Sequence, residues 1–290
     1  MKPKEKSAET VKEIADVLRC PLCHHPMKVF ALKSLVCKNN HTFDFAKQGY
    51  VNMMTRPSRS HYDKMLFEAR QKIIMESNLY ELLHKKISEV IEEYLEGSHD
   101  PTIILDAGCG EGSHLQRILK ECNDNTMTGI GLDISKEGIV MAAKHYRTPV
   151  WLVGDLANSP LASQSCHYIL NILSPANYQE FQRMMVPGGL MIKVVPRRNY
   201  LNELREVLFD DTDKKTYENN DTVSLFKQHF HLMDHFTINY TKSLSQIALK
   251  DLMQMSPLAW HAKQHNVDAV LNHCLPEVTI DLDILIGTNK

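Results

Sequence analysis

Four residues near the start of the chain have the types and spacing of a metal site. They are Cys20, Cys23, Cys37 and His41, in the pattern C-x2-C-x13-C-x3-H. Two close pairs of thiolate and imidazole ligands suit the tetrahedral coordination of zinc, and we expect one ion per chain. Because four protein ligands leave no position for water, the ion should stabilise a small fold and not catalyse. His24 and His25 are competing ligands with less favourable spacing, and four unrelated buried residues are the alternative to a metal site.

A second group of residues has the pattern of a nucleotide site. An apolar run that starts at Ile103 ends in a D-x-G-x-G-E-G loop, made by Asp106, Gly108, Gly110, Glu111 and Gly112. Glycines let the backbone approach a ligand at the carboxyl end of a strand, where open α/β sheets bind their ligands. A glycine-rich loop alone is weak evidence, because tight turns also need glycine. We interpret Cys109, between these glycines, as a small buried residue and not as a nucleophile.

Two further apolar runs end in a carboxylate. Asp133, followed by Ile134, comes 25 residues after the first loop glycine, where a carboxylate can accept both hydroxyls of a ribose. Asp155, followed by Leu156, ends the next run and is expected to hold the edge and face of an adenine. Asp106 identifies the ligand, because a carboxylate ahead of the glycines would repel a pyrophosphate but favour cationic sulfonium and amino groups. These residues predict S-adenosylmethionine as the cofactor.

The elements that must position these residues follow from hydrophobic periodicity. The runs TIILDAG, TGIGLDI, VWLVGD, YILNIL and LMIKVV alternate with helix-length segments, which indicates βαβ units and a parallel sheet. Residues 66 to 96, before these runs, have helical periodicity with an interruption near Ser77 and Asn78. FTINY and VTIDLDILIG alternate with a period of two and predict a terminal antiparallel pair, with Asp281 and Asp283 opposite the apolar side.

We expect an α/β protein with a small N-terminal domain. Residues 1 to 18 should form a tail or short helix, residues 19 to 50 a zinc-binding domain, residues 51 to 65 a polar linker, and residues 66 to 290 the domain with the parallel sheet. From Arg19 to Lys64 the chain has eight Lys or Arg and two Asp, a net charge of +6, so the remainder carries −8 within the total of −2. Such a local basic excess is expected where a domain binds a polyanion, with a solvated basic loop as the alternative.

Composition excludes several classes of protein. Hydrophobic residues make up 43% and charged residues 23% of the 290 residues, so collagen-like and disordered chains are excluded. No apolar run reaches the roughly 18 residues of a membrane span, and the first residues lack the apolar stretch of a signal peptide. We therefore expect a cytoplasmic protein with no membrane partner. Seven cysteines in a reducing compartment favour metal binding over disulfides.

Several motifs together resemble one enzyme family. CPLC, HTFDFAKQGYVNMM, FEARQKIIM, LDAGCGEG, GLDIS, VPGG and LMQMSPLAWHA are similar to motifs of the 23S rRNA guanine-N1-methyltransferase family, over residues 19 to 290. The resemblance implies a zinc-ribbon RNA-recognition domain joined to a class I, Rossmann-like methyltransferase domain. It also implies S-adenosylmethionine-dependent methylation of guanine N1 in a 23S rRNA hairpin near the peptide exit tunnel, by a homodimer. Some family members are linked to resistance to the antibiotic tylosin.

The resemblance also implies individual site residues. The glycine loop and Asp133 match the family's cofactor motif, and the two Cys/His pairs match its zinc motif. Tyr80, before the first strand of the parallel sheet, and Tyr200, after the fifth, look similar to family cofactor contacts, with ordinary half-buried tyrosines as the alternative. Asn171, at the end of the fourth strand, is a candidate beside the methyl group and the target base. Asp155 departs from the pattern, because relatives need not have a carboxylate there.

The sequence does not identify a catalytic base. Enzymes that methylate exocyclic amines usually have [DN]-P-P-[YFW] at the fourth strand end, where this chain has N-I-L-S-P-A-N-Y, and pyrimidine C5 methylation needs a Pro-Cys nucleophile that the chain lacks. A ring nitrogen or an oxygen remains as the target. Guanine N1 must lose its proton, but Glu180 and His114, the nearest titratable residues, are better described as a surface carboxylate and a helix-start histidine.

Two other functions are open from the sequence. The first is a small-molecule methyltransferase with a structural zinc ribbon, which the basic domain argues against, since small acceptors need no polyanion guide. The second is a noncatalytic zinc-ribbon protein that binds RNA or assists ribosome assembly, which the intact cofactor loop and Asp133 argue against. Arg56 and Arg59 are expected to contact phosphates of the RNA.

Overall fold

The structure is a computed structural model that describes residues 2–57, 62–94, 101–124, 126–209, 218–260, 262–272 and 277–290. Arg59, one of the two expected phosphate contacts, lies outside the described residues. Among the helices of the described part, none has the length and apolar character needed to cross a membrane.

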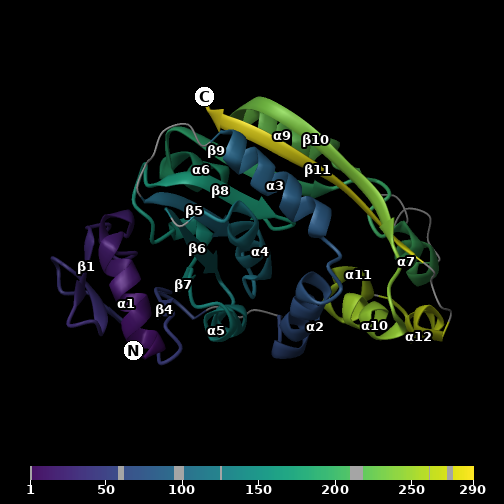
Figure 1. Cartoon of the computed structure of the whole chain (residues 1–290), viewed down its shortest axis with the longest axis horizontal. Helices are drawn as coiled ribbons and strands as arrows, with labels where there is room; N and C mark the ends of the chain where they lie inside the picture. Colours follow the sequence, from purple (N-terminus) through teal and green to yellow (C-terminus); the bar gives the residue numbers. More distant parts are fainter. Residues whose placement is uncertain are drawn as a thin grey trace.

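A sheet of eight strands, counted within the described residues, forms the centre of the molecule in the order β10-β11-β9-β8-β5-β6-β7-β4 (Figure 1). Its strands are β4 (Val51–Asn52), β5 (Thr102–Ala107), β6 (Met127–Asp133), β7 (Val150–Val153), β8 (Cys166–Ile172), β9 (Met185–Pro196), β10 (Phe230–Lys242) and β11 (Val278–Asn289). Strands β4 to β9 pair in parallel, and β11 pairs antiparallel with both β9 and β10. The predicted α/β class, with a parallel sheet and a terminal antiparallel pair, is confirmed.

Helices cover both faces of this sheet. One face packs against α2 (Lys64–Met75), α3 (Glu81–Glu93), α4 (Ser113–Cys122), α5 (Lys136–His145), α7 (Asn202–Leu208), α10 (Gln246–Met255), α11 (Pro257–Trp260) and α12 (Gln264–Asn272). The other face packs against α1 (Pro3–Glu13), the 3-10 turn η1 (Ala15–Val17), α6 (Tyr178–Met184) and α9 (Asn220–His229). The break between α2 and α3 confirms the interruption predicted near Ser77 and Asn78.

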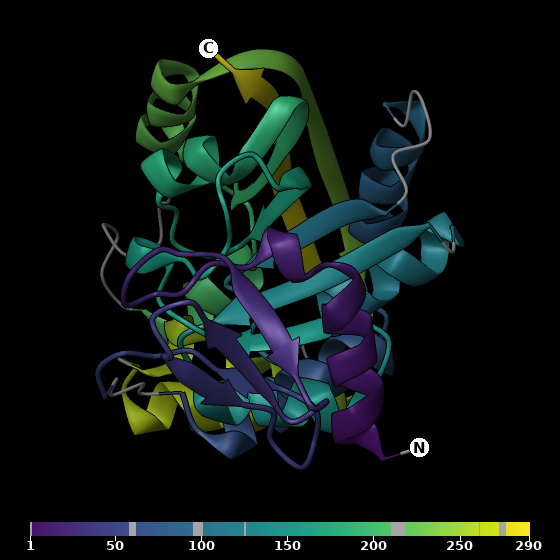
Figure 2. The same ribbon diagram turned by 90° about the vertical axis from the view of Figure 1, so that its left-hand side faces the viewer.

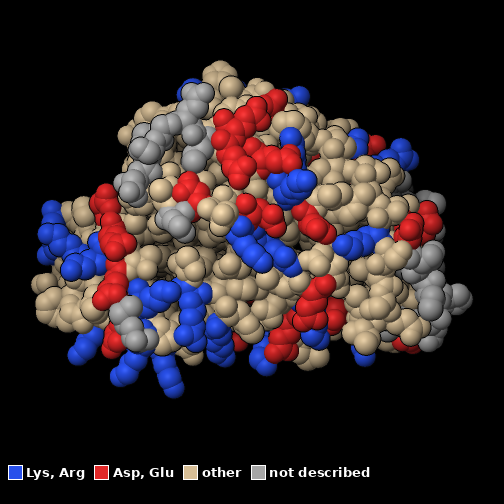
Figure 3. Space-filling model, viewed as in Figure 1, with Lys and Arg blue, Asp and Glu red and all other residues tan. Residues whose placement is uncertain are grey.

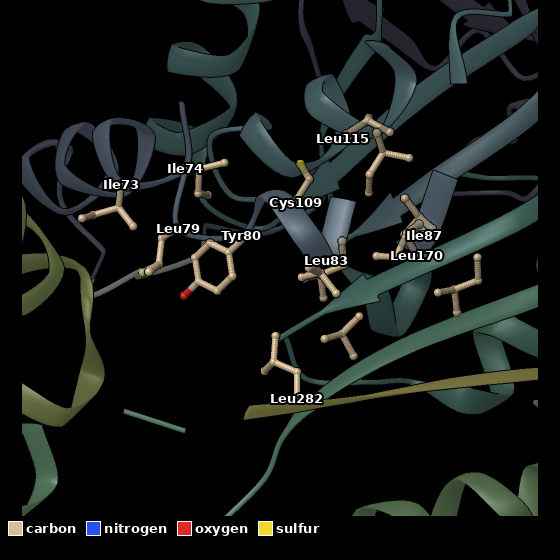
Figure 4. Close-up of a cluster of buried hydrophobic side chains, with 14 of the residues drawn as sticks. Ile73, Ile74, Leu79, Tyr80, Leu83, Ile87, Cys109, Leu115, Leu170 and Leu282 are labelled. Atoms are coloured by element: carbon tan, nitrogen blue, oxygen red, sulfur yellow. The ribbon is translucent and has the colours of Figure 1, made fainter. Parts of the chain in front are cut away.

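The apolar runs of the sequence are long because the central strands are covered on both sides. All six residues of β5 are buried, as expected for a parallel strand between two helical layers. Figure 4 shows side chains from α2, α3, β8 and β11 meeting in one cluster, among them Ile73, Leu83, Leu170 and Leu282. Each fully buried side chain of this size contributes about 1.5–3 kcal/mol to folding, so this layer holds the carboxyl ends of the strands rigidly in place.

The N-terminal domain is a small antiparallel sheet of β1 (Met27–Phe30), β2 (Ser34–Cys37) and β3 (Thr42–Asp44). Figure 2 shows it beside α1, against the edge of the main sheet that ends in β7 and β4. Ala8 and Val11 of α1 are buried, so residues expected to form a tail or short helix include a packed helix. The N–H of Arg19 donates to the carbonyl of Pro160 at 2.9 Å, which attaches the small domain to the loop after β7.

The segment expected to be a linker begins inside the main sheet. Val51 and Asn52 pair in parallel with Leu152 and Val153, and this pairing adds β4 to the sheet edge. Such a short edge strand has no signal in the sequence, because its two residues gain their order from pairing with β7 and not from their own periodicity. The zinc-binding domain and the sheet domain are therefore joined by backbone hydrogen bonds.

Candidate functional site

The predicted zinc ligands lie together in the N-terminal domain. Cys20 and Cys23 precede β1, Cys37 ends β2, and His41 precedes β3. Nδ1 of His41 lies 3.4, 3.3 and 3.6 Å from the Sγ atoms of Cys20, Cys23 and Cys37. The Sγ atoms of Cys23 and Cys37 are 3.6 Å apart, and the four ligand atoms all lie within 4.8 Å of one another. The structure thus brings together residues from two turns that are separated by a hairpin.

These separations fit a tetrahedral zinc ion. Zn–S bonds of about 2.3 Å and Zn–N bonds of about 2.0–2.1 Å place neighbouring ligands about 3.5–3.8 Å apart. Three thiols and one imidazole, without a carboxylate or an open position, are the donor set of a structural site. The competing histidines, His24 and His25, are not members of the cluster. The turn that contains them is closed by a backbone hydrogen bond, in which the N–H of Cys20 donates to the carbonyl of His25 at 2.8 Å.

The glycine loop makes a sharp turn from β5 into α4. Gly108, Gly110 and Gly112 have φ angles of +83°, +60° and +80°, in the left-handed region that side chains with a Cβ rarely adopt. A Cβ at Gly108 would lie 2.0 Å from Oγ of Ser174, and one at Gly112 would lie 2.3 Å from the ring of Trp151. Only glycine fits these positions, and the N–H groups of Gly108 and Gly112 donate to the carbonyls of Leu132 and Cys109, so the loop is held in one shape between β5 and α4.

Asp106 lies under this loop near the end of β5. Its side chain is buried, and burial raises the pKa of its carboxyl to about 7. The cation of Arg70 opposes this rise, while the charges of Asp133 and Glu111 add to it. A carboxyl group with a pKa near neutrality gains its charge when a cation binds beside it. Asp106 is therefore suited to a ligand with a positively charged group.

Asp133 ends β6, the strand beside β5. Its Oδ2 accepts the N–H of Gly110 at 2.8 Å, and its Oδ1 accepts the N–H of Ser135 at 2.7 Å. Burial raises the pKa of Asp133, and these two backbone hydrogen bonds oppose the rise. A carboxylate has about four acceptor positions, so two remain for the hydroxyls of a ribose. The next side chain, Ile134, is 41% exposed and offers an apolar surface at the same strand end.

Asp155 and Leu156 follow β7, the next strand. The N–H of Gly154 donates to the carbonyl of Asp133 at 2.9 Å, so the two strand ends are direct neighbours. Oδ1 of Asp155 accepts the N–H of Ala157 at 2.8 Å and caps the 3-10 turn η2 (Leu156–Asn158). Asp155 is exposed and Leu156 is half-buried. This capping bond gives Asp155 a structural role. The bond uses Oδ1 and does not involve Oδ2.

Arg70, on α2, is a site residue that sequence reasoning missed. Its guanidinium forms an ion pair with the fully buried carboxylate of Glu111 and donates to the carbonyl of Cys109 at 3.2 Å. Burial would lower the pKa of Arg70, but the ion pair with Glu111 outweighs burial and raises it. Oε1 of Glu111 is buried and has no hydrogen-bond partner among the described residues. The partners lie 41 residues apart, so spacing alone gave no signal for them.

Tyr80 and Tyr200 meet although 120 residues separate them. Their hydroxyl oxygens are 2.6 Å apart, and burial raises the pKa of both phenols. Tyr80 is fully buried at the start of α3 and packs edge-on against His114. The sequence analysis expected each tyrosine as a separate cofactor contact, and it did not expect their hydrogen bond, because nothing local links the two segments.

The two residues considered as catalytic bases make structural contacts. His114 hydrogen-bonds to His84 at 2.8 Å, and burial lowers the pKa of both histidines, that of His84 to about 3, so the pair is neutral. Glu180 pairs with Arg183 and Arg19 and accepts the N–H of Ser159 at 3.0 Å. Glu180 therefore connects α6 to the loop that holds the N-terminal domain.

Asn171 lies at the end of β8, on the other side of β5. Its Nδ2 donates to the carbonyls of Ala107 at 2.8 Å and Pro175 at 3.0 Å, while its Oδ1 accepts a hydrogen bond from Lys193. The strand order β8-β5-β6-β7 therefore places Asn171, Asp106, Asp133 and Asp155 in one row along the carboxyl edge of the sheet. Lys193, on β9, is the second residue that sequence reasoning missed.

This row of strand ends fits S-adenosylmethionine. Three buried or half-buried carboxylates, those of Asp106, Glu111 and Asp133, surround one glycine loop. Among the described residues, Oε1 of Glu111 has no hydrogen-bond partner. Such a site favours a ligand that carries an amino group and a sulfonium, and it opposes a phosphate. Asp106 and the loop would hold the amino acid part, and Asp133 the ribose.

Comparisons with known proteins agree with this geometry. Residues 18–58 match the family described as RlmA, N-terminal, a zinc ribbon, and residues 104–189 match the methyltransferase domain family. A protein of Bacillus subtilis (strain 168), provisionally named 23S rRNA (guanine-N(1)-)-methyltransferase YxjB, is 40% identical over 93% of this chain and 96% of its own. The 23S rRNA (guanine(748)-N(1))-methyltransferase of Streptomyces fradiae is 30% identical over 86% of this chain and 88% of its own.

The two relatives match 93% and 86% of the chain. The matched families cover the Cys/His cluster and the cofactor loop separately, so each cofactor has its own part of the chain. The chain therefore belongs to the 23S rRNA guanine-N1-methyltransferase family, as an enzyme with S-adenosylmethionine and zinc as its cofactors.

Proposed function

We propose that this enzyme methylates N1 of a guanine in a hairpin of 23S rRNA near the peptide exit tunnel. The observation that supports this best is the attachment of the zinc domain to the rim of the cofactor site. Nδ2 of Asn158 donates to the carbonyl of Pro21 at 2.8 Å, between the first two zinc ligands. Asn158 ends the turn that Asp155 caps. An RNA held by the zinc domain would therefore lie beside the strand ends that hold the methyl donor.

The surface of the zinc domain has the character of an RNA-binding surface. Its exposed basic residues are Lys28, Lys33, Lys38, Lys47 and Arg56. Figure 3 shows groups of Lys and Arg side chains at this end of the molecule and along the lower edge, with a stripe of Asp and Glu between them and a further group of Asp and Glu near the top. Phe30, at the end of β1, is 70% exposed among these cations. Cations that contact phosphates and an exposed aromatic ring that stacks on a base are the usual means of binding RNA loops.

The chain's own residues have three tasks in the reaction. The loop and Asp133 hold the cofactor, whose sulfonium supplies an electrophilic methyl group when bound. The zinc domain holds the RNA, and the strand ends of β5 and β8 receive the target base. The site must also remove the N1 proton of guanine, because a protonated ring nitrogen has no lone pair to attack the methyl group. Such an enzyme would work in the cytoplasm, and we propose that it acts as a homodimer and contributes to tylosin resistance.

A primer-extension experiment tests the proposal. A methyl group on guanine N1 blocks Watson–Crick pairing, so reverse transcriptase should stop one nucleotide before the modified base in 23S rRNA from cells that carry the gene. The stop should be missing in a deletion strain and return when the purified enzyme and S-adenosylmethionine are added to RNA from that strain. A parallel assay with small metabolites separates the alternative, since methylation of a metabolite without any rRNA stop would replace the rRNA proposal by a small-molecule one.

A further inference from the structure

Lys193 is a buried lysine in the middle of the main sheet. It lies on β9 between Asn171 of β8 and Leu285 of β11, and it is 4% exposed. The carboxylates that β11 carries on this side, Asp281 and Asp283, pair with Arg197 and not with Lys193. Burial lowers the pKa of Lys193 to about 8. Lys193 has no ion pair among the described residues, and a buried amine without one is costly, so this position calls for a reason beyond packing.

The amine of Lys193 is bound by the turn that follows β8. Its Nζ donates to Oδ1 of Asn171 and to the carbonyl of Ser174 at 2.7 Å. Leu173, one of the two residues between them, has a φ angle of +52°, in the left-handed region that is unfavourable for leucine. The N–H of Leu173 donates to the carbonyl of Val194 at 3.2 Å, beside the lysine. Lys193 thus holds a strained turn from both sides.

This turn lies directly against the cofactor loop. A Cβ at Gly108 would lie 2.0 Å from Oγ of Ser174, so the side chain of Ser174 occupies the space beside the loop that only glycine leaves free. Asn171 donates from its Nδ2 to the carbonyl of Ala107, the residue before that glycine. A displacement of the turn would therefore either move the loop or change the shape of the space in front of the loop, where the base must approach the cofactor.

We propose that Lys193 is a positioning residue for methyl transfer, whose amine fixes the turn from Asn171 to Ser174 so that the acceptor base meets the methyl donor in line. The inference rests on the proposed function, because it assumes an acceptor at the end of β8. Lys193 itself acts through Asn171 and Ser174. Small errors in the alignment of two reacting groups reduce rates strongly, so the turn is expected to affect the rate more than the binding of either substrate.

The test compares Lys193→Met with the wild type on undermethylated 23S rRNA. We expect kcat to fall roughly 10- to 100-fold, the size of effect that small misplacements produce. KM for the RNA and Kd for S-adenosylmethionine should change less than the rate does. Amide hydrogen exchange of the peptide that contains residues 171 to 175 should become faster without cofactor or RNA. Lys193→Arg keeps the charge and the donors, and it should regain part of the lost rate.

Lys290→Met is the matched control, because the amine of Lys290 also donates to a backbone carbonyl, that of Gln228, but at an exposed position. A Lys193→Met enzyme with kcat close to the wild type would overturn the proposal, and so would a loss that only follows the fraction of unfolded protein. If Lys193→Met does not fold, Lys193→Gln replaces it in the same comparison. A wild-type enzyme without activity on the RNA would instead refute the proposed function, whereas the exchange measurement still reports whether Lys193 holds the turn.

Discussion

At the scale of single residues, Asp106 shows how burial prepares an acidic group for a cationic ligand. Because its pKa in the folded protein is about 7, well above the ordinary value of 3.8, the folded state binds a proton that the unfolded state releases between these values. The contribution of Asp106 to stability is therefore present at low pH and is lost as the pH rises toward 7. A cation bound beside Asp106 would reverse this loss, so cofactor binding and protonation are linked.

We expect Asp106→Asn to separate stability from binding. Without cofactor, the variant should unfold at a higher temperature than the wild type, and the difference should be larger at pH 8 than at pH 5, because the unfolded wild type is ionised above pH 3.8 and the stability of Asp106 is lost up to pH 7. Its affinity for S-adenosylmethionine at pH 8 should fall by roughly 10- to 100-fold, since hydrogen bonds to charged groups contribute about 1.5–3 kcal/mol. Thermal unfolding and calorimetric titration at the two pH values check this. Equal affinity in the two proteins would remove Asp106 from the cofactor site.

At the scale of elements, the ion pair between Arg70 and Glu111 connects α2 to the glycine loop. Glu111 is fully buried and Arg70 is mostly buried, so removal of the arginine leaves a buried charge without a partner. Arg70 of α2 therefore stabilises the cofactor loop just before the start of α4.

We expect Arg70→Met to destabilise the protein by about 3–5 kcal/mol, the usual effect of breaking a buried ion pair. The double variant Arg70→Met with Glu111→Gln should recover part of this loss, because no unpaired charge is left in the interior. Urea unfolding of the wild type, both single variants and the double variant gives the coupling between the two positions. Additive effects in this cycle would mean that the pair does not act as a unit.

The zinc domain is an element of a different kind, because its small sheet has few apolar residues of its own. We expect that loss of zinc, by chelation or in Cys37→Ser, unfolds residues 19 to 50 and weakens RNA binding while cofactor binding stays nearly intact. The reason is that the four ligands and the cofactor loop share no residue, and the hydrogen bonds found between the domain and the sheet domain in the described part of the chain, including those to Asn158, Pro160 and Glu180, lie outside that loop. Metal analysis with parallel cofactor and RNA titrations tests it. Loss of cofactor and RNA binding together would show one folding unit.

At the scale of the whole molecule, the two binding regions carry opposite charge. The zinc domain is basic and the cofactor site is acidic, so a polyanion is attracted to the first and a cationic methyl donor to the second. Attachment of the zinc domain to the loop after β7 brings these two regions together.

We expect Arg56→Ala combined with Arg59→Ala to weaken RNA binding more strongly at low salt than at high salt, without moving the position of the reverse-transcriptase stop. Phosphate contacts orient an RNA but do not read its sequence, and each lost contact should reduce the slope of log affinity against log salt by about 0.7–0.9. Binding isotherms at several salt concentrations and primer extension check this. A stop at a new position would mean that these arginines select the target.

The sequence by itself determined the features that depend on local spacing. These are the two Cys/His pairs, the three glycines with positive φ, and the carboxylates at successive strand ends, because hairpins, tight turns and parallel strands place such residues without further information. Only the tertiary structure decided which distant groups form an ion pair or a hydrogen bond. Arg70 with Glu111, Lys193 with Asn171 and Tyr80 with Tyr200 come from separate elements. Asp281, expected opposite the apolar side of its strand, is buried and pairs with the partly exposed Arg197. Burial and long-range contact depend on how layers pack, and no pattern along the chain records that packing.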